Sequence, residues 1–265
     1  MNFYVIITLI SLIVHAGLAT LAMFAGCFVP RNTDAKGLLR GTKQSKNPRG
    51  GLNLAFSWAM FAVVVMEGGR LIFLLNPEGT NALLWIRVSL VGKCLIPANF
   101  FLFSLILGQD DCKEAINRGK RYLIPFYLIT LVFLAFTPSD LFIKQISGEY
   151  PNYQFIYGRI GQAQLIFSLL VILAILANLE NMYRQMQNLG TPFLRSKGVL
   201  SVKYPILVLI VVFFFQILIH SIAIAFSAMQ IEFLIAASLT LLIANISIAY
   251  PVLLPSAPAS KITIG

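Results

Sequence analysis

The stretch GLNLAFSWAMFAVVVMEGGRLIFLL, residues 51–75, decides the fold. Only Glu67 and Arg70 are charged in this run of otherwise uncharged and mainly apolar residues. As a helix rising ~1.5 Å per residue it would extend for about 37 Å, which exceeds the ~30 Å thickness of the hydrocarbon core of a bilayer. The stretch therefore predicts a transmembrane helix that carries two charges inside the membrane.

The composition of the whole chain agrees with this prediction. Of its 265 residues, 58% are hydrophobic and only 11% are charged, and the mean hydropathy is +0.83. Soluble domains have about 25% charged residues, so the chain is predicted to be an integral membrane protein whose first partner is the lipid bilayer. The net charge of +10 comes from residues in short segments between apolar runs, where they set topology and meet anionic head groups. Nucleic acid is not expected as a partner.

Seven apolar runs have the length of a membrane span and are bounded by charges, proline or glycine. They are residues 3–28, 51–75, 81–107, 122–141, 158–182, 204–229 and 231–254. The sequence therefore predicts an all-α, seven-transmembrane-helix bundle forming one membrane domain, residues 1–254, followed by a Pro-, Ser- and Ala-rich tail or linker at 255–265. The fourth run is the shortest, because Pro125 and Pro138 are expected to trim it.

The distribution of basic residues predicts the orientation. Fourteen Lys and Arg residues lie in segments 31–49, 113–121 and 184–203, whereas the alternate connections hold only Lys144 and Arg159. Because basic residues are retained on the cytoplasmic side, the N-terminus is predicted outside and the C-terminus inside. We expect a multi-pass protein of a bacterial cytoplasmic (inner) membrane.

Four charged residues are predicted to converge in the outer half of the bilayer. Glu67 lies about 16 residues from the inner end of its helix, and Arg70 follows on the same face. The short connection NPEGT makes the next helix an antiparallel neighbour, which brings Arg87 and Lys93 to a similar depth. A charge facing lipid costs about 2.5–3.5 kcal/mol, so we expect Glu67 to pair across the two helices.

Two interpretations of these charges stay open. The first is a structural ion pair, with Arg87 extending its side chain to the membrane surface. The second is a recognition pocket with a surplus of positive charge, which would favour a small anionic or amphiphilic ligand. The candidate pocket residues are Glu67, Arg70, Arg87, Lys93, Gln216 and His220.

The two histidines, His15 and His220, are predicted at similar depths on different helices. Such a pair could ligate haem, but a stripe of small and polar residues around His15 is more typical of helix packing with hydrogen bonds. The same packing role is expected for polar residues of the fifth and seventh helices, namely Gln162, Gln164, Ser168, Ser238, Asn245 and Ser247. No cofactor is expected on this interpretation.

Catalytic and metal-binding motifs are absent from the sequence. The three cysteines show no zinc-ligand spacing, and there is no phosphate-binding glycine loop, nucleophile elbow or HExxH motif. We therefore expect neither a metal site nor enzymatic activity within this chain. At the predicted cytoplasmic side, Glu180 and Arg184 are spaced to pair on the helix surface, and with Lys203 they form a candidate signalling edge.

Several short motifs resemble a known family. They are KNPRGGLNLAFSWAM with Trp58, LLWIRVSLVGKCLIPANFFLFSLILG with Arg87 and Pro97, and LANLENMYRQ followed by VKYPIL. Together they resemble the N-terminal seven-helix sensor module of bacterial membrane histidine kinases, most closely the PrsK type associated with PEP-CTERM and exosortase systems. The resemblance extends over roughly the whole chain, although only these motifs are distinctive.

The resemblance implies a sensory module that passes a signal to a cytoplasmic output domain, with a homodimer or a membrane-complex partner. The kinase region itself, with its phosphoacceptor histidine and ATP-binding glycine boxes, would have to lie downstream of Gly265. A non-catalytic structural or accessory subunit of a larger membrane complex is the alternative. A transporter is less favoured, because the sequence shows no internal repeats.

Overall fold

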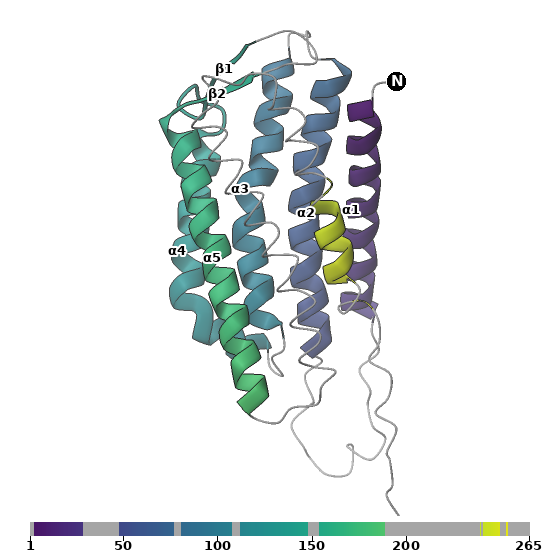
Figure 1. Ribbon diagram of the computed structural model, residues 1–265, viewed down its shortest axis with the longest axis vertical. Coiled ribbons are helices and arrows are strands. Elements are labelled where there is room, and N and C mark those ends of the chain that lie inside the picture. The colour runs from purple at the N-terminus through teal and green to yellow at the C-terminus, as the bar shows by residue number, and fades with distance from the viewer. Residues whose placement is uncertain are drawn as a thin grey trace, which may run out of the picture.

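The computed structural model describes residues 3–28, 48–76, 81–107, 112–147, 154–188, 239, 241–249 and 253. Within these ranges, five long helices run side by side along the long axis of the molecule (Figure 1). They are α1 (Phe3–Phe28), α2 (Pro48–Leu75), α3 (Ala82–Ile106), α4 (Cys112–Phe136) and α5 (Arg159–Asn188). All five are long and apolar enough to cross a membrane, so the chain is a helical, multi-pass membrane protein.

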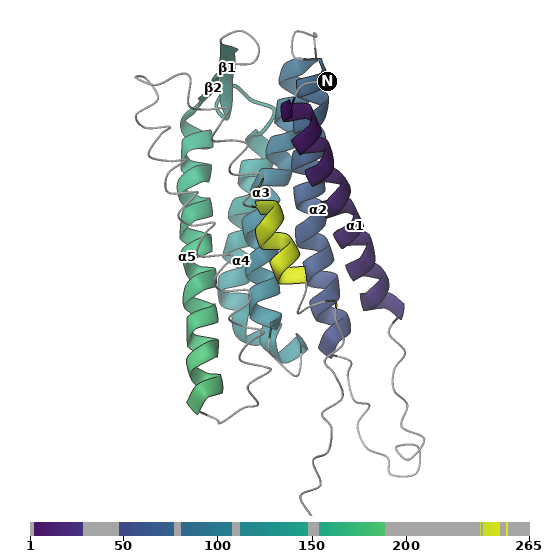
Figure 2. The same cartoon turned by 45° about the vertical axis from the view of Figure 1, so that its right-hand side comes forward.

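A short antiparallel β-hairpin joins α4 to α5. It consists of β1 (Ile143–Ser147) and β2 (Gln154–Tyr157), and the pairing is irregular between Ile143 and Gln145. The hairpin lies at the same end of the bundle as the N-terminus (Figures 1 and 2), and this end is called the hairpin end below. The sequence analysis did not predict these strands.

The helix order across the bundle places α3 at its centre. α1 and α5 lie at opposite edges (Figure 2), whereas α3 contacts α2, α4, α5 and β1. A helical stretch at 241–249, yellow in Figure 1, lies beside α1 and α2. The predicted sixth helix, residues 204–229, lies outside the described residues, as does most of the seventh.

Glycine permits the closest helix packing, which is between α2 and α3. A Cβ atom on Gly69 would lie 2.5 Å from the backbone nitrogen of Ser89 and 2.7 Å from the carbonyl oxygen of Trp85. A Cβ on Gly92 would collide with the backbone of Ala62 and Met66. Small residues allow two membrane helices to approach in this way, and van der Waals packing then stabilises the pair.

The fourth helix differs most from its prediction. It was expected at 122–141, but α4 begins at Cys112 and ends at Phe136, and it contains Pro125 in its interior. Pro138 stops the helix, and Thr137 and Ser139 donate side-chain hydrogen bonds of 2.7 Å to the carbonyls of Leu134 and Phe136. The basic segment 113–121 is therefore helical and continuous with the span, rather than a loop.

Candidate functional site

Glu67 of α2 and Lys93 of α3 both lie close to one apolar cluster. Val63 and Met66 of α2 pack with Leu241, and Ile96 of α3 packs against this group. Glu67 lies one turn beyond Val63 toward the hairpin end, and Lys93 lies one turn beyond Ile96 in the same direction. Both residues therefore sit at a similar depth, one turn from a shared cluster in the bundle interior.

Glu67 is fully buried and pairs within its own helix. Its Oε1 lies 3.5 Å from Nη1 of Arg70, whose side chain is 21% exposed. The two residues are three positions apart, so the pair forms on a single helix face, and both make further interactions. Pairing the carboxylate with a guanidinium lowers the cost of placing either charge in the membrane.

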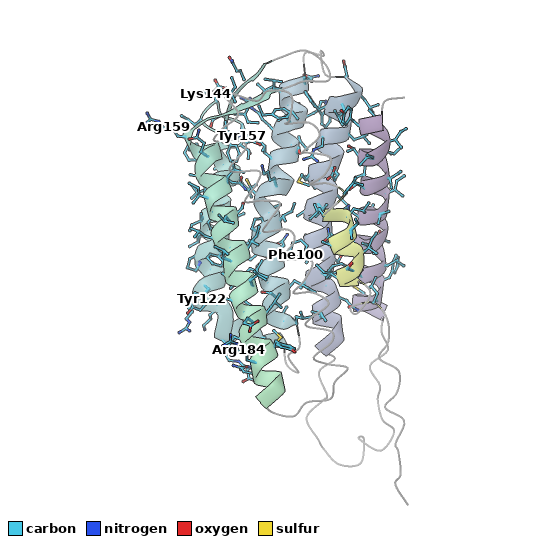
Figure 3. All side chains as sticks on the ribbon, viewed as in Figure 1. Phe100, Tyr122, Lys144, Tyr157, Arg159 and Arg184 are labelled. Atoms are coloured by element: carbon cyan, nitrogen blue, oxygen red, sulfur yellow. The ribbon has the colours of Figure 1, made fainter. Side chains whose placement is uncertain are left out.

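Lys93 connects α3 to the β-hairpin. Its Nζ lies 3.4 Å from the hydroxyl oxygen of Tyr157 and 5.3 Å from the centre of the same ring. Tyr157 is the last residue of β2 and is labelled near the hairpin end in Figure 3. Among the described residues no carboxylate lies within ion-pair distance of Lys93, so its charge is met by a neutral phenol. We call the two pairs Glu67–Arg70 and Lys93–Tyr157, which lie at a similar depth, the intramembrane polar cluster.

Arg87 forms its ion pair outside this cluster, as expected in the interpretation in which its side chain extends to the membrane surface. Its Nη2 lies 2.8 Å from Oδ1 of Asp140, which follows α4 and is 82% exposed. Arg87 is two turns nearer the start of α3 than Lys93, so its side chain reaches the surface at the hairpin end. Because Asp140 neutralises Arg87, the formal surplus among the four predicted charges falls from two to one.

The hairpin is fastened to the bundle by apolar and backbone contacts as well. Phe142 and Ile143 are fully buried in a cluster with Phe73 of α2 and Phe133 of α4. The carbonyls of Leu141 and Phe142 accept hydrogen bonds from the backbone of Ile160 and Gly158, at 3.1 and 2.9 Å. The hairpin therefore forms part of the folded bundle rather than an independent appendage.

His15 is fully buried and hydrogen-bonded at both ring nitrogens. Its Nδ1 lies 2.7 Å from the carbonyl oxygen of Ser11, and its Nε2 lies 2.9 Å from Nδ2 of Asn245. A carbonyl accepts and an amide nitrogen donates, so these partners assign a neutral ring protonated at Nδ1. The nitrogen that haem iron would need already accepts a hydrogen bond, so His15 as found here fits helix packing and not haem ligation.

A second set of polar contacts links the helices. These contacts lie farther from the hairpin than the intramembrane polar cluster does. Asn99 of α3 donates to the carbonyl of Trp58 in α2 at 3.2 Å, and accepts from the hydroxyl of Tyr127 in α4 at 2.7 Å. Asn178 of α5 donates to the carbonyl of Ser104 in α3 at 2.9 Å. We call these contacts the central hydrogen-bond network. It joins four of the five helices through α3.

The remaining predicted site residues are placed only in part. Glu180 and Arg184 form an exposed ion pair of 2.8 Å near the end of α5 that is remote from the hairpin (Figure 3). Gln164 and Ser168 are buried as expected, but their hydrogen bond of 2.8 Å lies within α5, and Gln162 is exposed rather than interior. Gln216, His220 and Lys203 lie outside the described residues. In the described part of the chain, no group of three or more His, Cys, Asp or Glu residues could hold a metal ion.

Comparisons of this chain with protein-family models, with curated proteins and with solved structures gave no match. The resemblance to the sensor module of histidine kinases therefore stays a prediction.

Several functional contacts were missed by the sequence analysis. Asn99, Tyr127 and Asn178 were not singled out, although an amide inside an apolar run is itself a signal of interhelical hydrogen bonding. Tyr157 was missed because the connection before the fifth helix was treated as a loop, and Asp140 was missed because it lay within the predicted fourth span, residues 122–141. The signal was present in IKQIS and QFIY, two β-rich segments separated by a stretch containing Gly, Pro and Asn.

Proposed function

We propose that this chain is a membrane-embedded sensory module, with its hairpin end facing the outside of a bacterial cytoplasmic membrane. The intramembrane polar cluster receives an anionic or amphiphilic ligand. The change is passed along α3 to the cytoplasmic ends of α4 and α5, where an output domain or partner would respond. Phosphotransfer is not assigned to any residue of this chain.

The observation that carries this proposal is the state of Lys93. A cation in a span is costly unless it is paired, and its contacts in the described part of the chain are with the neutral Tyr157 side chain. An anionic head group beside Lys93 would supply the missing charge, at a depth that an amphiphile in the outer leaflet can reach. Such a ligand would compete with Tyr157 for the same ammonium group.

The path to the other side runs through one helix. Pro97 lies one turn from Lys93, and because proline has no N–H, the Lys93 carbonyl lacks its usual helical donor. A missing bond of this kind lets a helix bend locally. Asn99 and Ser104 then connect the next turns of α3 to α2, α4 and α5. Shifts of ~1–2 Å between packed helices are the usual scale of such signalling changes.

The binding part of the proposal is tested by thermal unfolding of the full chain in phosphatidylcholine nanodiscs. Dodecanoate and lysophosphatidylglycerol are the anionic probes, and dodecanol is the neutral control. We expect an anionic probe to raise the Tm of the wild-type protein and of Lys93→Arg, but not of Lys93→Met. Equal stabilisation of Lys93→Met, or equal stabilisation by dodecanol, would contradict the proposed site.

The relay is tested separately by the distance between spin labels at Lys113 of α4 and Arg184 of α5, both near the end remote from the hairpin. We expect the probe that stabilises the protein to shift this distance by ~1–2 Å, and Pro97→Ala to reduce the shift without removing the Tm response. If the ligand binds but the distance does not change, the chain is a binding protein and not a sensor.

A further inference from the structure

A basic surface on α4 lies at the end of the bundle remote from the hairpin. Four cations, Lys113, Arg118, Lys120 and Arg121, are all exposed within the first ten residues of the helix. Tyr122 follows them and is 49% exposed; Figure 3 shows it far from the hairpin. The only acidic residue of α4 is Glu114, 3.6 Å from Arg118. We call Lys113, Arg118, Lys120, Arg121 and Tyr122 the α4 basic collar.

The collar faces away from the protein. On the opposite side of the same turns, Ala115 is buried, Gly119 packs against the side chain of Leu105, and Ile116 and Leu123 pack against the main core cluster. The basic residues are thus directed outward by the packing of the helix and not by an unstructured loop.

The same outward face continues into an apolar surface. Ile124, Leu128, Leu131 and Val132 are each more than half exposed along the following turns of α4. In a chain that spans a membrane, this surface meets acyl chains, so the collar on the same face lies where acyl chains give way to head groups. Counting back ~20 residues from Phe136 for the hydrocarbon core reaches about residue 117, which lies within the stretch of α4 that carries the collar.

The side-chain chemistry suits an interfacial position. The Arg121 guanidinium carbon lies 4.7 Å from the centre of the Tyr122 ring, which holds the cation beside an amphipathic aromatic. Pro125, four residues on, has no N–H for the Arg121 carbonyl, so this carbonyl can accept a hydrogen bond from a head-group hydroxyl.

We infer that the α4 basic collar binds the phosphate group of anionic phospholipids in the adjacent leaflet. The exposed Lys120 and Arg121 supply most of the attraction, and the continuous apolar face receives the acyl chains of the same lipid. An acidic protein or a soluble anion would use the charges but not the apolar face, which is why a lipid is the occupant favoured here. This site is independent of the intramembrane polar cluster.

The test measures lipid contact at the collar directly. The full chain is placed in phosphatidylcholine nanodiscs containing a trace of phosphatidylglycerol with a photoreactive group beside the glycerol, and crosslinks are mapped by mass spectrometry. We expect crosslinks within residues 113–128. Since each basic residue near an anionic surface changes affinity by about fivefold, Lys120→Gln/Arg121→Gln should lower the yield about tenfold or more.

Three controls accompany this test, namely two further double variants and the addition of inorganic phosphate. Lys144→Gln/Arg159→Gln removes the same charge at the hairpin end and should change the yield less than twofold. Lys120→Arg/Arg121→Lys keeps both charges and should retain the yield, which separates charge from folding. The inference would be overturned if the crosslink yield were unchanged in Lys120→Gln/Arg121→Gln or fell equally in Lys144→Gln/Arg159→Gln. It would also be overturned if inorganic phosphate, added at constant ionic strength, abolished the crosslinks.

Discussion

The two halves of this bundle differ in the polar side-chain contacts that join their elements. At the hairpin end, contacts between elements involve charged groups, namely Arg87 with Asp140 and Lys93 with Tyr157. On the other side of the polar cluster, the contacts are neutral hydrogen bonds centred on Asn99 and Asn178. Charged contacts near a surface respond to salt and to competing ions, whereas neutral hydrogen bonds inside a bundle do not. In the proposed sensory module, the hairpin end would therefore receive the chemical signal and the other half would transmit it.

Both halves depend on the α2–α3 pair, and disrupting that pair should have the largest effect. Gly92→Leu would force a side chain into the backbone of Ala62 and Met66. We expect a loss of about 3 kcal/mol or more, measured as a fall in folded yield and in Tm. Gly17→Leu is the matched control, because nothing lies within 4 Å of the corresponding Cβ position and Gly17 is exposed. Equal damage from both substitutions would show that the close α2–α3 approach is not responsible.

The neutral half is tested by Asn99→Leu. This change removes a donor to Trp58 and an acceptor for Tyr127 while keeping the side-chain volume similar. We expect a cost of about 0.6–1.7 kcal/mol in thermal unfolding, the range found for hydrogen bonds between membrane helices. The cost should be the same at low and high salt. A strong salt dependence would contradict the division between the two halves.

The charged half is tested first by Tyr157→Phe, which removes the hydroxyl that Lys93 contacts and retains the ring. We expect a loss of only about 0.5–1 kcal/mol, but faster hydrogen exchange in β1 and β2, because the hairpin loses a polar link to α3. Exchange that accelerates instead across α4 and α5 would indicate a general loss of packing.

The smallest effect is expected from the Arg87–Asp140 pair, since one partner is 82% exposed. A double-mutant cycle with Arg87→Gln and Asp140→Asn should give a coupling energy of about 0.2–1 kcal/mol at low salt. At 1 M salt the coupling should vanish, because the Debye length is then only ~3 Å. A coupling energy that persists at 1 M salt would show that this pair is shielded from solvent, like the buried contacts of the polar cluster.

The sequence predicted the spans better than the connections. The bounds of α1 were predicted correctly at 3–28, and those of α3 to within one residue at each end, because hydropathy alone determines where such helices must run. The beginning of α4 was predicted ten residues too late, since its charged residues were assigned to a loop although they belong to the same continuous helix. Hydropathy does not distinguish a charged loop from a charged extension of a helix.

The candidate site was predicted in part. Glu67 and Lys93 were placed at similar depths by counting residues along two antiparallel helices, and the structure puts both one turn from a shared apolar cluster. Arg87 was assigned to the pocket in only one of the two interpretations left open, and its ion pair with Asp140 agrees with the other, in which the side chain extends to the membrane surface. Tyr157 comes from a separate element, so no pattern within α2 or α3 could have revealed it.

The glycine contacts at Gly69 and Gly92 also bear on how the chain enters its membrane. The two helices are linked by a segment of only four residues, 77–80, besides Asn76 and Asn81, and their backbones leave no space for lipid between them at these positions. We expect α2 and α3 to leave the insertion machinery as a pair. Glu67, Arg70 and Lys93 would then enter the bilayer beside a neighbouring helix, which lowers the cost of inserting their charges.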